Sequence, residues 1–227
     1  MIRWHAALSL LLLLALPAFA VAQTPEQEAK KARHQTRPEG WNIRPDRAGA
    51  DTSEIYFATI EPGFHVTTGP AAIFWHPDST ATGSFRAEVG IHLFDPGRRR
   101  EAYGLFVGGR NLDGPNQAYT YFLVRRTGEY LIKRRTGSDT ETLVGWTAHD
   151  AVVSWDEKDP DAQTTLNTLA VEAGPEELVF RVNGSEVDRV PREGLGVEGV
   201  VGVRVNHALN VHVGGIEIEE GRGASGR

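Results

Sequence analysis

The acidic and imidazole side chains near the middle of the chain are the first candidates for chemistry. Glu88 and His92 lie in a run of ten residues, 85–94, in which large apolar residues alternate with other residues. This alternation predicts a β-strand with one buried face, so both side chains are expected on the opposite face, about 13 Å apart. That separation is too long for a direct pair, but both can line one wall of a curved sheet. They are candidates for acid/base catalysis or for hydrogen bonds to sugar hydroxyls, with an ordinary solvated sheet face as the alternative.

A second pair of side chains suits recognition of a sugar. Tyr121 and Arg125 lie four residues apart in a run of aromatic and β-branched residues, 119–125, which predicts another strand. An aromatic ring can stack on the C–H face of a sugar, and an arginine fork can donate to hydroxyls or to a carboxylate. The alternative is ordinary cross-strand packing.

Metal and cofactor chemistry has little support. Asn111, Asp113 and Asn116 form an oxygen-rich loop that is a candidate for Ca²⁺, although its spacing matches no EF-hand. Otherwise we expect no cofactor and no metal, because the remaining histidines lack the spacing of a transition-metal site: His65, His76, His149 and His212. The chain has no phosphate-binding glycine loop, no Gly-x-Ser-x-Gly motif and no cysteine. Nucleotide-dependent, α/β-hydrolase and thiol chemistries are therefore not expected.

The organisation of the chain indicates export. Residues 1–22 combine Arg3, an apolar stretch and small residues near 18–22, which is typical of a cleaved signal peptide rather than a membrane anchor. We expect a periplasmic or extracellular location, with membrane contact only through export. A polar linker at 23–40, one domain at 41–220 and a flexible tail at 221–227 would follow.

Charge argues against nucleic acid as a partner, because the formal net charge of the 227-residue chain is −6. Cationic residues are nevertheless concentrated between positions 98 and 135, where nine Arg or Lys accompany three Asp or Glu. This concentration indicates either a solvated rim on exposed strands or a surface for an anionic ligand.

The fold class follows from many short strands with frequent turns. After the runs at 85–94 and 119–125, Thr127-Gly128 predicts a hairpin into 129–135, and Asn183-Gly184 predicts another between 177–182 and 185–190. The segment 76–80 is expected to be a loop, and 149–163 a long polar connection that is functional or mobile. No segment after residue 22 has convincing helical periodicity, so we expect an all-β antiparallel two-sheet jelly-roll sandwich. The further expected strands are 55–60, 64–67, 71–75, 103–108, 142–146, 167–172, 199–205, 209–213 and 215–219.

Three segments carry a family resemblance: 167–171 (Asn-Thr-Leu-Ala-Val), 180–184 (Phe-Arg-Val-Asn-Gly) and 202–207 (Gly-Val-Arg-Val-Asn-His). Across residues 41–219 the chain resembles the concanavalin-A-like jelly rolls and, within them, the 3-keto-disaccharide hydrolase-like domain. The resemblance implies a glycoside hydrolase acting on keto-sugars, and it places Asn206 and His207 in the family's terminal histidine motif. The chain departs from that pattern at residues 119–122, which lack the family's carboxylate, and at Ala208, which replaces a glycine.

These observations favour a secreted, non-catalytic module that binds a glycan or a surface, with Tyr121, Arg125 and Asn206 as ligand-binding candidates. The alternative enzyme would use Glu88 with His92 or His207. A structural envelope protein is the third reading. The sequence leaves open whether the protein is an enzyme.

Overall fold

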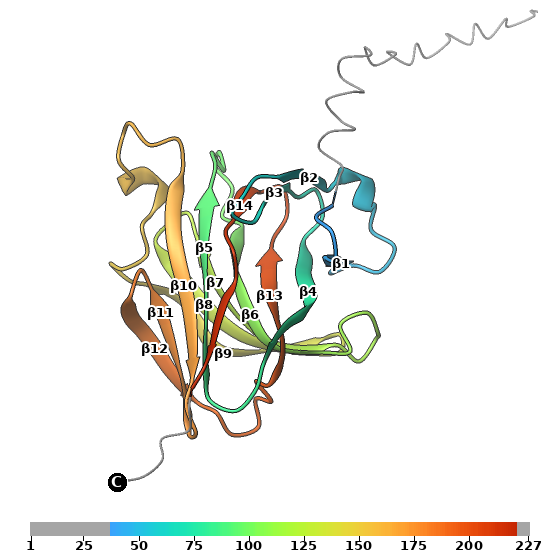
Figure 1. Cartoon of the computed structure of the whole chain (residues 1–227). Coiled ribbons are helices and arrows are strands. Elements are labelled where there is room, and N and C mark those ends of the chain that lie inside the picture. The colour runs from blue at the N-terminus through green and yellow to red at the C-terminus, as the bar shows by residue number, and fades with distance from the viewer. Residues whose placement is uncertain (1–36, 222–227) are drawn as a thin grey trace, which may run out of the picture.

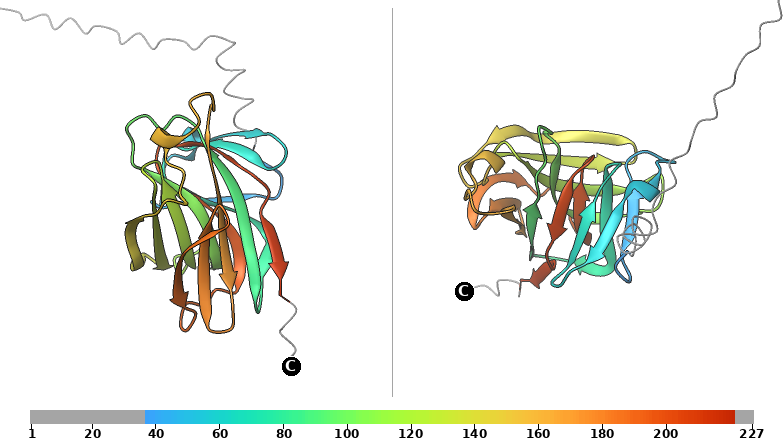
Figure 2. Two further views of the ribbon diagram at one scale, coloured as in Figure 1. Left: turned by 90° about the vertical axis from the view of Figure 1, so that its left-hand side faces the viewer. Right: turned by 90° about the horizontal axis from the view of Figure 1, so that it is seen from above.

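The computed structural model describes residues 37–221, which form two antiparallel sheets stacked face to face (Figures 1 and 2). The expected signal peptide at 1–22 and most of the expected linker and tail lie outside these residues. Within residues 37–221 the only helical segments are two 3₁₀ turns, η1 (Thr52–Glu54) and η2 (Trp155–Glu157). No helix among them has the length and apolar character needed to cross a membrane. The all-β fold class is confirmed.

One sheet has seven strands and carries the aromatic run predicted at 119–125. Its order is β1 (Asn42–Pro45), β4 (Ala72–Ala81), β13 (Gly199–Val205), β6 (Ala102–Arg110), β7 (Ala118–Arg125), β8 (Glu129–Thr136) and β9 (Asp139–Ala148). In Figure 1, the turn between β6 and β7 projects at the right, below β1.

The other sheet has eight strands and contains the alternating run predicted at 85–94. Its order is β12 (Ser185–Pro191), β11 (Glu177–Val182), β10 (Thr165–Ala173), β5 (Phe85–Leu93), β14 (Asn210–Val213), β3 (Phe64–Thr67) and β2 (Tyr56–Thr59), while β15 (Glu217–Glu220) pairs with the first half of β5. The hairpin at Asn183-Gly184 is confirmed, because both residues have the positive φ angles that a type I′ turn requires.

The core lies between the sheets and is built by the period of two. Along β5 the residues alternate between buried and half-buried, and Phe85, Val89 and Ile91 are at most 4% exposed. From the opposite sheet, Leu105 and Phe122 join the same apolar cluster. The expected inward face of 85–94 is therefore confirmed, and Glu88 and His92 point away from the core.

The expected loop at 76–80 is wrong, because β4 continues to Ala81. The register with β13 shifts between Val200 and Gly202, and the residues 76–79 that bulge out have no Cα partners in β13. β1 pairs only with the first part of β4, so Pro77 occupies a stretch where its missing N–H disrupts no regular ladder. The polar composition of 76–80 suggested a loop, but a β-bulge lets these polar residues lie in an extended strand.

The long connection at 149–163 is held in place by one buried side chain. Asn167 is 1% exposed. Its Oδ1 accepts hydrogen bonds from the backbone N–H of Val153 (2.9 Å) and Nδ2 of Asn183 (3.1 Å), and its Nδ2 donates to the Val153 carbonyl (3.1 Å) and the Tyr103 hydroxyl (3.2 Å). All four bonds that an amide side chain can make are thus used. This asparagine, one of the residues that carry the family resemblance, joins the two sheets and the connection.

Candidate functional site

The outer face of the seven-stranded sheet carries a second apolar cluster. It arises because β7 places aromatic or branched residues on both of its faces. The turn after β6 covers one end of the cluster through Leu112, and Nη1 of Arg44 donates to the carbonyls of Leu112 (2.7 Å) and Gly114 (2.6 Å). The buried members are Ile73, Trp75, Ala102, Phe106, Leu112, Tyr119, Tyr121, Leu123 and Leu131. This face is therefore a packed surface, and only particular side chains on it are accessible.

A buried ion pair lies at the centre of this face. Nη1 of Arg204 donates to Oδ1 of Asp46 (2.6 Å), and its Nη2 donates to the other carboxylate oxygen. The Arg204 guanidinium lies 5.2 Å from the ring centroid of Tyr121, and Nη1 is 3.4 Å from the Tyr119 hydroxyl. Nη1 of Arg135 is 3.7 Å from Oδ1 of Asp46, so two cations share one carboxylate.

An exposed indole lies towards the other edge of the same face. Trp146 on β9 is 38% exposed, and the Arg125 guanidinium lies 4.1 Å from its ring centroid. Nε of Arg125 donates to Oε2 of Glu129 (2.7 Å), and Thr127 also donates to that carboxylate. The hydrogen bonds from Arg125 and Thr127 lower the pKa of Glu129, against the opposing effect of partial burial. Glu129 is therefore held as a carboxylate.

Strand register explains how these side chains meet. Arg125 and Glu129 are directly opposite each other across the β7–β8 hairpin. Alternation along β8 then places Glu129, Leu131 and Lys133 on one face. In the bulge between the pairs Tyr130–Thr147 and Ile132–Val144, the two residues Gly145 and Trp146 lie opposite Leu131. We call Trp146, Arg125, Glu129, Leu131 and Lys133 the Trp146 face.

The structure separates the three predicted ligand-binding residues. Arg125 belongs to the Trp146 face. Tyr121 lies on the same side of the sheet, as predicted, but it is 6% exposed and packed beneath Arg204, so its ring does not offer a stacking surface. Asn206 follows β13, where its backbone N–H donates to the Ala102 carbonyl (2.9 Å). Its binding role stays a prediction.

Two of the predicted catalytic residues share a strand, and the third lies on the other sheet. Glu88 and His92 are on the outer face of β5 in the eight-stranded sheet, and Glu88 forms an ion pair with Arg86. His207 follows β13 of the seven-stranded sheet; its side chain is 65% exposed and 3.8 Å from Glu101. The structure therefore does not bring Glu88 and His207 together as an acid/base pair.

A row of histidines on the eight-stranded sheet was not foreseen. His65, His212 and His92 are register partners on β3, β14 and β5, with neighbouring ring centroids 6.5 and 6.0 Å apart. Nδ1 of His92 is 3.0 Å from the Thr164 hydroxyl. Partial burial, followed by the charge of His212, lowers the pKa of His92. Between residues 37 and 221, no three His, Asp or Glu side chains are gathered as a ready metal site.

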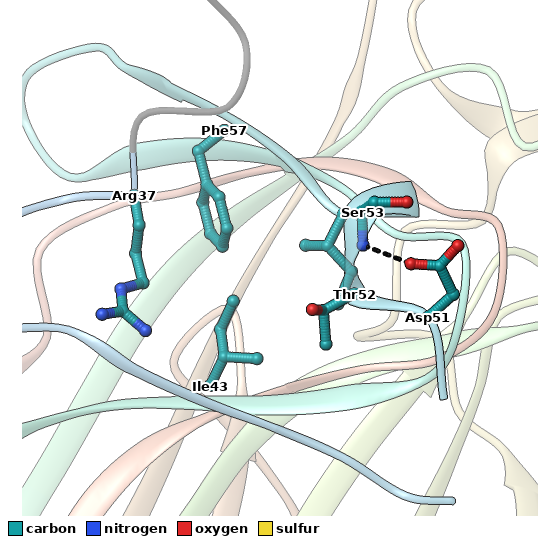
Figure 3. Close-up of a pocket in the computed structure, with 7 residues that line it drawn as sticks. Arg37, Ile43, Asp51, Thr52, Ser53 and Phe57 are labelled. Carbon is teal, nitrogen blue, oxygen red and sulfur yellow. Dashed lines mark hydrogen bonds between the residues drawn. The ribbon is translucent and has the colours of Figure 1, made fainter. Parts of the chain in front are cut away.

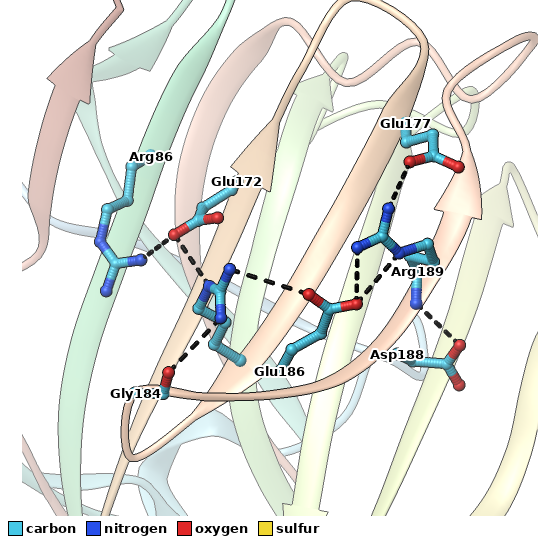
Figure 4. Close-up of polar contacts among 8 residues, drawn as sticks. Arg86, Glu172, Glu177, Gly184, Glu186, Asp188 and Arg189 are labelled. Carbon is cyan, nitrogen blue, oxygen red and sulfur yellow. Dashed lines mark hydrogen bonds and ion pairs between the residues drawn. The ribbon is translucent and has the colours of Figure 1, made fainter.

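Charged side chains elsewhere on the eight-stranded sheet neutralise one another. A ladder of ion pairs crosses four strands, and Figure 4 shows its part from Arg86 on β5 to Glu177 and Arg189 on β11 and β12. Its members are Glu88, Arg86, Glu172, Arg181, Glu186, Arg189 and Glu177. Because cations and carboxylates alternate along it, this surface has little unbalanced charge with which to attract an ionic ligand.

Two cavities are lined by residues outside the Trp146 face. One of about 630 Å³ lies beside β1 and β2, with an apolar floor that includes Ile43 and Phe57 (Figure 3). At its rim, the Asp51 carboxylate accepts a hydrogen bond from the Ser53 backbone N–H (2.9 Å) and caps η1. The Asp51 carboxylate at this cavity is thus used to cap η1.

The candidate calcium loop lines a second cavity, of about 320 Å³, together with Trp75 and Val200. Asn111 has a positive φ, and its carbonyl accepts a hydrogen bond from the Gly114 N–H (2.9 Å), which closes a turn. Two carbonyls of this loop already accept from Arg44. Calcium at this loop remains a prediction from the sequence.

The residues missed at the sequence level are Trp146, Glu129 and Lys133. Strand parity along the predicted strand 129–135 is the signal that could have placed Glu129 and Lys133 on one face. The bulge that aligns Trp146 with them left no recognisable signal in the sequence, because it depends on the pairing of β8 with β9.

No protein-family model matches the sequence, and no curated protein sequence matches it. Solved structures do resemble it. The carbohydrate-binding module CBM66 from Bacillus subtilis superposes with a TM-score of 0.58 at 14% identity, covering 80% of this chain and 96% of that one. A B. subtilis protein of unknown function with a galectin-like fold gives 0.56 at 12% identity, covering 83% and 93%. A Bacteroides ovatus GH16 protein from a mixed-linkage glucan locus gives 0.55 at 6% identity, covering 82% and 98%.

These likenesses show the fold. The chain has the β-sandwich fold of galectins and concanavalin-A-like proteins, and the predicted concanavalin-A-like two-sheet sandwich is confirmed. The narrower resemblance to the 3-keto-disaccharide hydrolase-like domain rests on the three sequence segments alone.

Proposed function

We propose that the protein is an exported carbohydrate-binding module without catalytic activity, and that it binds saccharides on the Trp146 face. The observation that carries the proposal is the exposed indole of Trp146 beside the fixed Arg125–Glu129 pair. An indole offers a broad apolar surface for the C–H face of a sugar, while a guanidinium and a carboxylate offer donors and acceptors for its hydroxyls.

The fold likeness supports the same proposal. Structural neighbours include a protein described as a carbohydrate-binding module and a GH16 protein solved with a glucan product. The hydrolase alternative has less support, because Glu88 is ion-paired on one sheet and His207 follows a strand of the other.

Binding should be tested with the full chain on a panel of glycans, followed by calorimetry on the ligands that bind. Trp146→Ala should weaken binding at least about tenfold, which corresponds to ~1.4 kcal/mol of lost contact. Leu166→Ala is the matched control, because Leu166 is also a large exposed apolar residue (44%) but lies on the other sheet. Equal affinity of the wild type and Trp146→Ala for every bound glycan would overturn the proposed site. Release of a cleaved product in the same assay would overturn the non-catalytic role.

A further inference from the structure

Lys133 is an unpaired cation on the Trp146 face. Among residues 37–221, Lys133 makes no ion pair and no side-chain hydrogen bond, and it is half-buried. Its neighbours by register are Tyr121 on β7 and Thr142 on β9, and neither of them can neutralise it. The amine thus stands on this face without a counter-charge.

Most other cations on the outer face of this sheet are engaged by carboxylates. Arg125 binds Glu129, and Arg204 and Arg135 share Asp46. Arg44 is bonded to backbone carbonyls, which leaves its charge uncompensated. Even with the Asp113 carboxylate of the β6–β7 turn counted beside Asp46 and Glu129, these cations and Lys133 leave an excess of positive charge on this face, although the whole chain has a formal net charge of −6. A local excess of one sign raises the concentration of ligands of the other sign.

Spacing places Lys133 where it can meet a substituent of a bound sugar. Along β8, Lys133 is two residues from Leu131, which is about 7 Å in an extended strand and comparable to the width of one sugar ring. Trp146 lies in the bulge opposite Leu131, and the Arg125–Glu129 pair lies at the next step in the other direction. Because the Arg125 guanidinium covers one face of the indole, a sugar ring would stack on the other face, with the free amine of Lys133 one step away along β8.

We propose that the Trp146 face selects acidic saccharides, in which a pyranose ring carries a carboxylate, and that Lys133 binds this carboxylate. This rests on the proposed function. The ammonium group of lysine is a compact point charge with three donors, which suits a carboxylate on a mobile ring better than it suits a neutral hydroxyl. Lys133 is thus a specificity residue, while Trp146 supplies affinity for any ring.

The test compares matched oligosaccharides on the full chain: an oligogalacturonide, the same oligomer with its carboxyl groups reduced to alcohols, and a sulfated oligosaccharide of equal length. The wild type should bind the oligogalacturonide about tenfold more tightly than the reduced oligomer. The preference should shrink as salt is added, because this lysine is partly exposed. Tighter binding of the sulfated oligomer than of the oligogalacturonide would overturn the assignment to a carboxylate.

Variants separate the inference from the function on which it rests. Lys133→Gln should abolish the preference while keeping the weaker binding of the reduced oligomer, and Lys133→Arg should retain the preference. Lys158→Gln is the matched control, because Lys158 also lies beside an indole, that of Trp155, at 5.2 Å, but on another surface. Equal binding of the acidic and reduced oligomers by the wild type, dependent on Trp146, would overturn this inference and leave the proposed function standing. Persistence of the preference in Lys133→Gln would overturn the role of Lys133. Failure of every oligomer and glycan to bind would overturn both.

Discussion

Asp46→Asn should destabilise the protein more than Arg204→Met, although both substitutions break the same ion pair. The two partners differ in their surroundings: the Arg204 side chain is 8% exposed, whereas that of Asp46 is 27% exposed and lies near a second cation, Arg135. Nε of Arg204 also has no hydrogen-bond partner within the described chain. Removing the carboxylate leaves a buried charge without compensation, while removing the guanidinium leaves a carboxylate with water and Arg135 beside it.

The magnitude follows from the cost of an unpaired buried charge. Loss of one partner of a buried pair costs about 3–5 kcal/mol, and we expect this for Asp46→Asn. For a domain of this size each kcal/mol lowers Tm by about 2–4 °C, so Tm should fall by roughly 6–20 °C. Methionine keeps the apolar contact over Tyr121, and Arg204→Met should cost only about 1–2 kcal/mol.

Urea unfolding followed by tryptophan fluorescence measures these differences, and the double variant provides the decisive comparison. Asp46→Asn combined with Arg204→Met should be more stable than Asp46→Asn alone, because it carries no uncompensated buried charge. Equal destabilisation by the two single variants, or simple additivity in the double variant, would show that the uncompensated Arg204 charge does not set the cost.

The pH at which the comparison is made also matters. Burial alone would raise the pKa of Asp46, but hydrogen bonds and charge from Arg204, with the charge of Arg135, outweigh it and lower the pKa below 3.8. A carboxyl with a lowered folded-state pKa stabilises the fold above its unfolded-state pKa, and that contribution is lost as the pH falls through the folded-state value. The difference between the wild type and Asp46→Asn should therefore be fully present at pH 5 and 7.

Two further predictions concern stability. Partial burial, followed by the charge of His212, lowers the pKa of His92, so the folded state resists protonation of this ring. The contribution of the neutral His92 ring to the free energy of unfolding should be fully present above about pH 6.5, the unfolded-state pKa, and should be lost as the pH falls through the folded-state pKa. Tm of the wild type should fall more between pH 7.5 and 5.5 than Tm of His92→Gln, and parallel losses would contradict this. Asn167→Ala leaves the backbone groups of Val153 without side-chain partners, so it should cost about 2–4 kcal/mol and speed amide exchange in the connection 149–163, whereas the exposed Asn116→Ala should change neither.

Local patterns in the sequence predicted many of the strands of this fold. The alternation along β5 and the Asn183-Gly184 turn each depend on backbone geometry within a few residues, so they could be read directly. The bulge at 76–79 could not be read, because it exists only where β4 pairs with β13. The apolar residues on both faces of β7 predicted that this strand is buried on both sides, but they did not show that Leu112 of the turn after β6 packs on its outer face.

The candidate site divides in the same way. Short alternating runs predicted an all-β sandwich, the outer face shared by Glu88 and His92, and the placement of Tyr121 and Arg125 on one side of a strand, because side-chain direction alternates with a period of two. Strand pairing in the folded protein, in contrast, buries Tyr121 beneath Arg204, aligns three histidines from distant segments in a row, and leaves the ring of Trp146 accessible beside Arg125. These facts depend on which strands become neighbours and in which register. Pairings of that kind are set by the packing of the whole sandwich, and no segment of the chain carries them alone.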